Sequence, residues 1–234
     1  MPKRFCFTGN SLNELCMSTP SPNHSTDGYY VAASALDHSE LSIGLRFNIT
    51  SNAETVSTLI FWRNFYDYKE VYFHLYTYGG KVILSTKLDG SIELFSGLHL
   101  NEWYSLWIDI YESDLEYHLY RYSTNTTTSD STGKTYYEAV DSYIFVMNTS
   151  TADAPLLGTM CDLIIIPGRY SELRNVYMQE GLCYVLTNFW PMREGSGTTC
   201  RCLRTPSIGL QSGGSVTAPG WVNTFGTNEG RRWV

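Results

Sequence analysis

Residues 103–122, WYSLWIDIYESDLEYHLYRY, carry the pattern that decides the fold class. In the first half of this stretch, Leu106, Ile108 and Ile110 alternate with polar or aromatic residues. The same alternation returns in residues 115–122. Successive side chains of an extended strand point to opposite faces, so a period of two predicts two half-buried β-strands. The polar residues between the two runs predict a turn, and therefore an antiparallel hairpin.

The rest of the chain repeats this theme of short β-prone runs. Runs rich in Tyr, Ile, Val, Leu and Trp alternate with clusters of Gly, Asn, Asp and Ser, and helical periodicity is nearly absent. This pattern predicts an all-β fold, a two-sheet antiparallel sandwich. The predicted strands are residues 41–49, 58–63, 70–78, 81–88, 92–95, 103–111, 116–122, 142–147 and 161–167.

Two segments depart from the strand pattern. Residues 171–179 predict one short helix, because Ser171 can cap its start and Gly181 can end it. Residues 123–135 contain nine Ser or Thr residues among thirteen and no large apolar group, so we expect a solvated loop there. The predicted organisation is an N-terminal strand and loop segment at residues 1–28, a sandwich at 29–187 and an extended terminal segment at 188–234.

Composition and charge exclude several classes of protein. The 234 residues include 16 Lys or Arg and 23 Asp or Glu, for a formal net charge of −7. Apolar residues make up 43% of the chain, which is enough to bury a core, so wholesale disorder is excluded. The sequence has no dense basic run, and nucleic acid is therefore not an expected partner. Its apolar runs are too short to span a bilayer, so we expect no membrane span.

Sequons and cysteines favour a secreted, extracellular glycoprotein. The sequons are at Asn23, Asn48, Asn125 and Asn148, and the cysteines are Cys6, Cys16, Cys161, Cys183, Cys200 and Cys202. An even number of cysteines suits a disulfide framework, with Cys161 and Cys183 as the preferred pair, while buried thiols and a metal site stay open as alternatives. Residues 5–16 are too polar for a signal peptide, so we expect a different biological start or another route of export.

Five segments, taken in order, resemble the laminin G-like members of the concanavalin A-like jelly-roll superfamily. They are residues 41–47 (LSIGLRF), 98–110 (LHLNEWYSLWIDI), 116–120 (EYHLY), 157–166 (LGTMCDLIII) and 170–173 (YSEL). Residues 121–122 depart from the Asp-Gly turn that usually follows the third of these segments. The resemblance covers roughly residues 28–180 and implies a jelly roll. Many relatives are carbohydrate- or receptor-binding modules.

A further segment is similar to the opening of such a domain but lies at the other end of this chain. Residues 189–199 (FWPMREGSGTT) and 220–222 (GWV) would, in that family, precede a strand like residues 4–9 (RFCFTG). Three arrangements stay open: the segment returns to its own sandwich, fills the same slot in a neighbouring subunit, or docks loosely as a tail. Its aromatic anchors would be Trp190, Trp221, Phe225 and Trp233.

The strand faces opposite the apolar core are rich in aromatic residues. A solvated face would carry Lys, Glu and Thr, so we expect a contact surface for protein or carbohydrate, unless the terminal segments cover it. The candidates are Tyr72, His74, Tyr76, Tyr78, Trp103, Trp107, Tyr111, His118 and Tyr120. A carbohydrate site would expose Tyr72, Tyr76, Trp107 and Tyr120 in a concave groove.

A catalytic site has weaker support. Glu112-Ser-Asp114-Leu-Glu116 fits the E-x-D-x-E pattern of retaining β-glucanases, but the resemblance places a turn there, so a solvated hairpin tip is the favoured interpretation. The histidines are scattered through the chain. Calcium ligands could come from Asp130, Asp141, Asp153 and Asp162, yet no dense acidic loop exists. We expect no catalytic residue, no metal and no cofactor.

The predicted function is therefore that of an extracellular, non-catalytic glycoprotein of a structural or adhesive kind. It would self-associate into oligomers or a fibre by exchanging residues 188–234 between subunits, because a contact that repeats without closing produces filaments. One alternative is a lectin-like module that binds carbohydrate or a receptor. The other is a glycoside hydrolase that uses Glu112 and Glu116.

Overall fold

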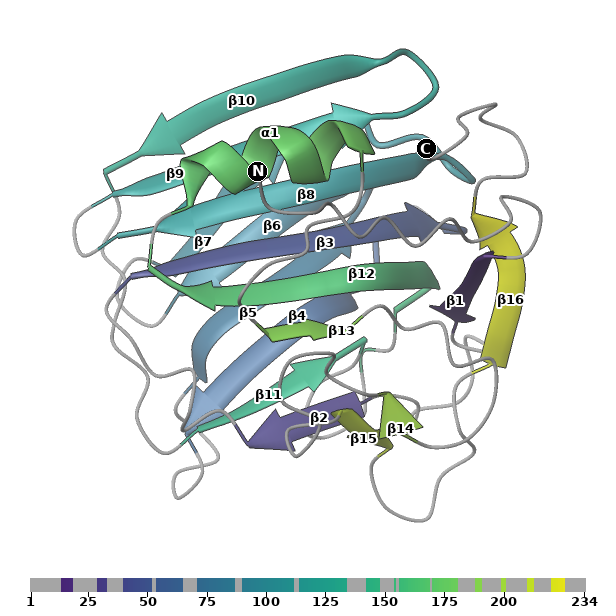
Figure 1. Ribbon diagram of the computed structural model, residues 1–234, viewed down its shortest axis with the longest axis horizontal. Helices are drawn as coiled ribbons and strands as arrows, with labels where there is room; N and C mark the ends of the chain where they lie inside the picture. Colours follow the sequence, from purple (N-terminus) through teal and green to yellow (C-terminus); the bar gives the residue numbers. More distant parts are fainter. Residues whose placement is uncertain are drawn as a thin grey trace, which may run out of the picture.

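The computed structural model is a sandwich of two antiparallel β-sheets, called sheet A and sheet B below (Figure 1). The structure describes residues 14–18, 29–32, 40–51, 54–64, 71–86, 90–111, 114–133, 142–147, 154, 156–168, 170–180, 188–190, 199–200, 210–212 and 220–225. The predicted fold class, an all-β two-sheet antiparallel sandwich with a short helix, is confirmed.

Each sheet combines strands from the middle of the chain with strands from both ends. In spatial order, sheet A contains β10 (Thr126–Thr132), β9 (Leu115–Arg121), β8 (Trp103–Ile110), β3 (Leu41–Ile49), β12 (Gly158–Pro167), β1 (Glu14–Ser18) and β16 (Gly220–Phe225), with β13 (Asn188–Trp190) also paired to β12. Sheet B contains β14 (Thr199–Cys200), β15 (Leu210–Ser212), β2 (Tyr29–Ala32), β11 (Ser142–Val146), β4 (Ser57–Asn64), β5 (Val71–Tyr78), β6 (Lys81–Thr86) and β7 (Gly90–Phe95).

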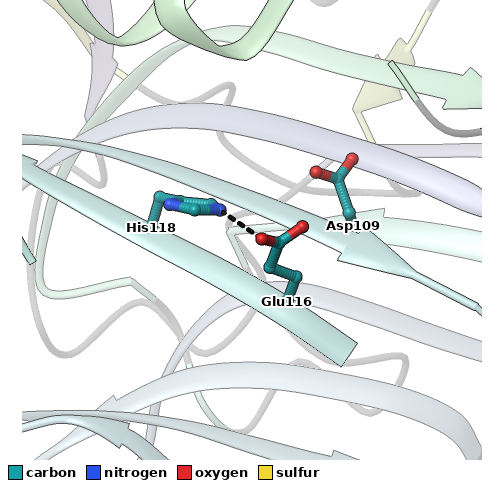
Figure 2. Close-up of side chains that lie close together, drawn as sticks. All are labelled: Asp109, Glu116 and His118. Carbon is teal, nitrogen blue, oxygen red and sulfur yellow. Dashed lines mark ion pairs between the residues drawn. The ribbon is translucent and has the colours of Figure 1, made fainter. Parts of the chain in front are cut away.

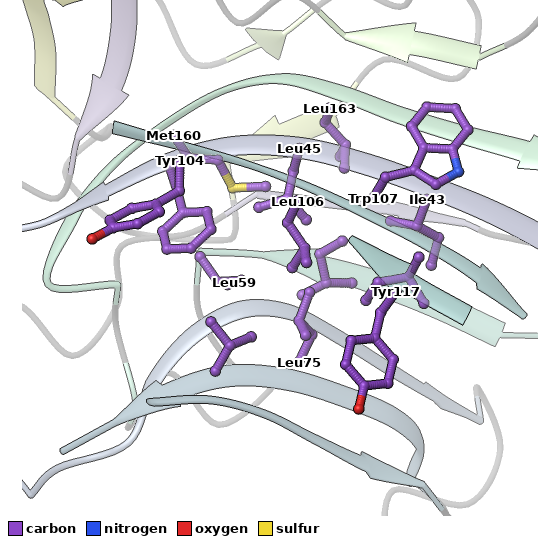
Figure 3. Packing of buried hydrophobic residues seen from close by; sticks show 14 of the residues in the cluster. Ile43, Leu45, Leu59, Leu75, Tyr104, Leu106, Trp107, Tyr117, Met160 and Leu163 are labelled. Carbon is purple, nitrogen blue, oxygen red and sulfur yellow. The ribbon is translucent and has the colours of Figure 1, made fainter. Parts of the chain in front are cut away.

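The apolar core lies between the two sheets, where the alternating residues of the strands meet (Figure 3). Leu45 on β3 stands directly opposite Leu106 on β8, and both are fully buried. Leu59 and Leu75 reach the same core from sheet B. Complete burial of a side chain of this size contributes about 1.5–3 kcal/mol, so the period-two pattern of the strands is the main stabilising feature.

The prediction of a solvated loop at residues 123–135 is wrong. Residues 126–132 form β10, which pairs with β9 along its whole length from Thr126↔Arg121 to Thr132↔Leu115. The strand lies at the edge of sheet A and is almost entirely exposed. Thr is β-branched and favours strands, and an edge strand needs no apolar face, so a run of Thr and Ser can form a strand without burying anything.

Helix α1 (Ser171–Glu180) lies across the outer face of sheet A and contacts β8 and β9 (Figure 1). Its position agrees with the predicted helix at residues 171–179. The outer face of a sheet is the face turned away from the other sheet, so the part of sheet A around β8 and β9 is covered on both sides. In the described part of the chain, no helix has the length and the apolar character needed to cross a membrane.

The strands of residues 188–225 pair with strands from the same chain. β13 pairs with β12, β15 pairs with β2, and β16 pairs with β1, where Cys16 stands opposite Val222. Figure 1 shows β16 beside β1 at one edge of the sandwich. We call residues 188–234 the C-terminal arm. The domain boundaries at residues 28 and 187 stay a prediction.

Candidate functional site beneath helix α1

The outer face of sheet A is polar and aromatic, as the sequence indicates, but it is not exposed. Trp103, Trp107, His118 and Tyr120 are all buried, so the prediction that they form a solvent-facing surface is wrong. For Trp107 and His118 the physical reason is α1, whose Tyr177 packs on Trp107 with ring centroids 5.4 Å apart and whose Arg174 contacts His118. The expected groove with Trp107 and Tyr120 at its surface is therefore absent from the described part of sheet A.

The remaining members of the aromatic set lie elsewhere. Tyr111 is half-buried at the end of β8, and His74 and Tyr76 are half-buried on sheet B, with ring centroids 4.6 Å apart. Tyr78 is exposed at the β5–β6 turn. The side chain of Tyr72 lies outside the described residues. Whether these aromatic residues form a contact surface stays a prediction.

Three ligand-type side chains gather on the outer face of sheet A: Asp109 from β8, and Glu116 and His118 from β9 (Figure 2). We call them the carboxylate–histidine cluster. The register places Asp109 directly opposite Glu116 and Trp107 opposite His118, so the two carboxylates are cross-strand neighbours. Like charges at such positions destabilise a sheet, and a nearby cation is needed to offset their repulsion.

Arg174 of α1 supplies that cation. Its Nη1 atom lies 3.5 Å from Asp109 Oδ2, 3.5 Å from Glu116 Oε2 and 2.7 Å from His118 Nε2. A guanidinium can only donate hydrogen bonds, so His118 Nε2 accepts, and the ring proton belongs on Nδ1. Nδ1 then donates to Ser129 Oγ of β10 at 2.6 Å. Burial, and then the charge of Arg174, lower the pKa of His118.

Asp109 accepts two hydrogen bonds at one oxygen and has only the ion pair with Arg174 at the other. Its Oδ1 accepts hydrogen bonds from Ser42 Oγ at 2.5 Å and Trp107 Nε1 at 2.9 Å. Among the residues that the structure describes, none donates a hydrogen bond to Oδ2, although Asp109 is fully buried. The carboxylate is thus oriented by its neighbours and presents Oδ2 toward Arg174.

A second buried network lies further along the same face. Arg46 of β3 forms an ion pair with Asp162 of β12 at 3.2 Å and donates to the carbonyl oxygen of Tyr177 at 3.2 Å. The Tyr177 hydroxyl donates in turn to the Asp162 carbonyl oxygen at 2.7 Å. Burial raises the pKa of Tyr122, which lies under the Arg46 guanidinium, to about 12. This network fixes α1 to sheet A.

Asp162, a sequence candidate for calcium, therefore has a structural partner. It lies at a break in the β12–β3 register between Cys161 and Ile164, with φ of 53°, and its side chain is fully buried against Arg46. Asp130 is exposed on β10, and Asp141 and Asp153 lie outside the described residues. The structure brings no two of these aspartates together among the residues it describes.

Of the two predicted hydrolase residues, Glu112 and Glu116, the structure describes only Glu116. Tyr111 N donates to the Asp114 carbonyl oxygen at 2.8 Å, which closes the connection between β8 and β9 as the predicted hairpin requires. Glu116 belongs to the carboxylate–histidine cluster, and Glu112 lies outside the described residues. The cluster itself was not predicted. Its sequence signal is Glu-x-His on one strand opposite an Asp on the preceding strand.

The sequons, cysteines and arm anchors are only partly described. Asn125 is exposed in the β9–β10 turn, and Asn48 is half-buried within β3. Cys161 is a buried thiol, so its preferred pairing with Cys183 gains no support from the structure. Trp190 lies on β13, and Trp221 and Phe225 lie on β16. Cys16 and Cys200 lie on β1 and β14, and their side chains are outside the described residues, as are Asn23, Asn148, Cys6, Cys183, Cys202 and Trp233.

An open cleft of about 350 Å³ lies between β7 and β10, the edge strands of sheets B and A. Its lining combines polar and apolar residues. The lining residues are Glu93, Leu94, Phe95, Ser96, Gly97, Leu98, Tyr104, Leu119, Arg121, Thr126 and Thr128. Arg121 is oriented by a bidentate pair with Glu102, at 2.5 and 2.8 Å.

No protein-family model and no curated protein matches the sequence. Solved structures do match. A SAP-like pentraxin from Limulus polyphemus has a TM-score of 0.52 and 8% identity, over 79% of this chain and 94% of its own. A candidate carbohydrate binding protein from Bacteroides ovatus has a TM-score of 0.56 and 10% identity, over 89% of this chain and 61% of its own. A sialidase from Trypanosoma rangeli has a TM-score of 0.53 and 11% identity, over 73% of this chain and 28% of its own.

These likenesses concern the fold. The fold is a two-sheet jelly roll, as the resemblance in the sequence implied. Laminin G domains are also among the similar structures, with TM-scores of 0.49 and 0.45. Because the similar structures include a sialidase as well as a candidate carbohydrate binding protein, the fold does not decide between catalysis and binding.

Proposed function

We propose that the protein is an extracellular, non-catalytic glycoprotein of a structural or adhesive kind, which self-associates by exchange of its C-terminal arm. The observation that carries this proposal is the position of the arm strands. β16 is the terminal strand of sheet A, β14 is the terminal strand of sheet B, and β13 lies beside the path of sheet A. Exchange with a neighbouring subunit would therefore require no central strand to move.

Domain exchange uses the same contacts between chains that the closed chain makes within itself. The β16–β1 pairing involves five register positions, from Glu14↔Phe225 to Ser18↔Gly220, and the β13–β12 pairing involves three. These are short pairings, and opening them exposes few backbone groups. An arm that leaves its own sheets can then complete those of a neighbour, and a head-to-tail series of such exchanges extends without closing.

The extracellular location is supported by two features. Asn125 of the Asn125-Thr-Thr127 sequon is exposed in a turn, where a glycan can be attached without disturbing the sheet. Besides the buried Cys161 thiol, five cysteines remain available for the disulfides that secreted domains use. Which of them pair is part of the proposal.

A competition experiment tests arm exchange. The full chain is refolded with and without an excess of a synthetic peptide spanning residues 188–234, and the mass of the product is followed by light scattering. A peptide that takes the place of the donated arm should end growing assemblies and lower their mass. A peptide with the same composition in scrambled order is the control. Assemblies that are unaffected by the authentic peptide would contradict exchange.

The cleft between β7 and β10 favours carbohydrate binding as a second candidate function. Its lining combines apolar side chains with the polar side chains of Glu93, Arg121, Thr126 and Thr128, which is the mixture of surfaces that sugars contact. Thr128→Val keeps the β-branched shape and removes one hydroxyl from the cleft. Under this function, the variant should weaken retention on an oligosaccharide array, whereas Thr132→Val, at the other end of β10 and outside the cleft lining, should not. Equal retention by both variants would exclude the cleft.

A further inference from the structure

We propose that Asp109, Glu116 and His118 form a binding site for a divalent transition-metal ion of the zinc class, in which the metal and the Arg174 guanidinium compete for one position. The site lies on the outer face of sheet A beneath α1 (Figure 2). It is independent of the C-terminal arm and of the cleft between β7 and β10.

The donor set has the chemistry that such an ion prefers. One imidazole nitrogen and two carboxylate oxygens are typical ligands of catalytic and exchangeable zinc sites, which keep a fourth position for water. The three ligand atoms all lie within 4.8 Å of one another, and His118 Nε2 is 3.8 Å from Glu116 Oε1. Zinc–ligand bonds are about 2.0–2.2 Å long, so the ligands must draw inward by about 1 Å. Glu116 can move inward because its side chain is 28% exposed.

A second, independent observation is that one ligand atom of the cluster has an ion pair but no hydrogen bond. Asp109 is fully buried, and no described residue donates a hydrogen bond to its Oδ2 atom. A buried carboxylate oxygen without a donor is costly, and a directly bound cation would remove that cost. The neighbouring atoms already orient the ligands, because Ser42 and Trp107 hold Asp109 Oδ1 and Ser129 holds His118 Nδ1. Such outer contacts are what orients metal ligands in proteins.

The position that a metal would take is the one that Arg174 Nη1 holds, between His118 Nε2 and the two carboxylates. The guanidinium shows that the cluster attracts a cation, but it satisfies the cluster incompletely. It brings one positive charge against two carboxylates, and its 3.5 Å contacts are longer than a hydrogen bond. A divalent ion would balance both carboxylates. The Arg174 side chain is 18% exposed, so it can turn outward into solvent when the ion enters.

Titration of the chelator-treated full chain with Co²⁺ tests the site, because the visible absorption of Co²⁺ reports its coordination, and Zn²⁺ can then displace it. We expect one Co²⁺ per chain. Removal of a ligand in His118→Gln or Glu116→Gln should weaken binding by about tenfold or more, on the scale of supporting-residue losses. Arg174→Met, which removes the competitor and keeps the length of the side chain, should strengthen binding and give a larger rise in Tm with Zn²⁺ than the natural chain shows.

His99→Gln is the matched control, because His99 is exposed and lies outside the cluster. It should leave the affinity and the spectrum unchanged. The proposal is overturned if folded natural chain and folded Arg174→Met both fail to bind Co²⁺. It is equally overturned if both ligand variants bind with unchanged affinity, or if His99→Gln abolishes binding, since the ion would then lie elsewhere. Glu116→Gln keeps the test decisive if His118→Gln does not fold, because Glu116 is the more exposed ligand.

Discussion

Gly44 of β3 lies directly against the indole ring of Trp107 on β8: a methyl group at position 44 would come within 2.8 Å of Trp107 Cε3 and 3.1 Å of Tyr177 Cε1. The absence of a side chain at this one position lets the Trp107 ring lie over β3 and lets α1 settle on sheet A. The glycine is thus required by close packing rather than by backbone conformation.

Gly44→Ala should therefore loosen α1. The added methyl group overpacks a fully buried site, and the expected loss is about 1–3 kcal/mol in the free energy of unfolding, measured by urea denaturation. Gly133→Ala is the control, since nothing lies within 4 Å of the methyl group that it would introduce. The control should stay within about 0.5 kcal/mol of the natural chain. Equal losses in both variants would show that Gly44 is not a packing position.

Trp107→Ala should act on stability and should have no separate effect on the retention of glycans. Trp107 is fully buried between β3 and α1, and its indole nitrogen holds Asp109. Truncation of a buried Trp costs about 3–5 kcal/mol because it leaves a cavity. Urea denaturation and near-ultraviolet circular dichroism measure the effect. A variant of natural stability that has lost only the retention of glycans would restore Trp107 as a ligand-binding residue.

Asp162→Asn should be among the most damaging single substitutions. It keeps a residue type that tolerates the positive φ of this position, but it leaves the buried Arg46 without its counter-charge. Removal of one partner from a buried ion pair costs about 3–5 kcal/mol. Lys81→Gln is the matched control, because the Lys81–Glu93 pair is exposed and should make no measurable contribution. Similar unfolding midpoints for the two variants would contradict the structural role of Arg46–Asp162.

The inner face of sheet A could be predicted from the sequence, and its outer face could not. Leu106 and Ile108 alternate with polar or aromatic neighbours, and this period alone places them in the core. The same pattern does not predict what covers Trp107 and His118, because a helix that packs on the outer face of a sheet does not change the periodicity of the strands. Aromatic residues opposite the core fit an interface and a second core equally well.

The carboxylate–histidine cluster escaped sequence analysis for a related reason. Asp109 and Glu116 become neighbours only through the β8–β9 register, and Arg174 reaches them from a helix that follows them by more than fifty residues. Period-two spacing shows that Glu116 and His118 share a face. It does not show that they share that face with an arginine. The sequence analysis also missed β10. This strand is exposed and has no apolar alternation, so the β-propensity of its Thr residues was the only signal for it.

Asn125 should be the modified sequon among those that the structure describes. Expression in a secreting eukaryotic cell should give a glycosylated chain whose electrophoretic mobility changes on treatment with an N-glycosidase. Asn125→Gln should reduce this mobility change by the contribution of one glycan, because Asn125 is exposed in a turn. Asn48→Gln should not change the shift, because Asn48 is half-buried in β3, within sheet A. A shift that depends on Asn48 and not on Asn125 would contradict the prediction.

Arm exchange is tested most directly by a cross-link between β1 and β16. Leu15 and Asn223 stand opposite each other in the register, at the separation of directly paired residues that a disulfide can bridge. Chains with Leu15→Cys and Asn223→Cys are prepared with natural nitrogen and with ¹⁵N, mixed while unfolded, refolded together and oxidised. Mass spectrometry then identifies the peptides joined through positions 15 and 223. Exchange of the arm predicts joined peptides that carry one label each. Joined peptides of a single label only, or no join between these two positions, would contradict the proposal that the arm is donated from one subunit to the next.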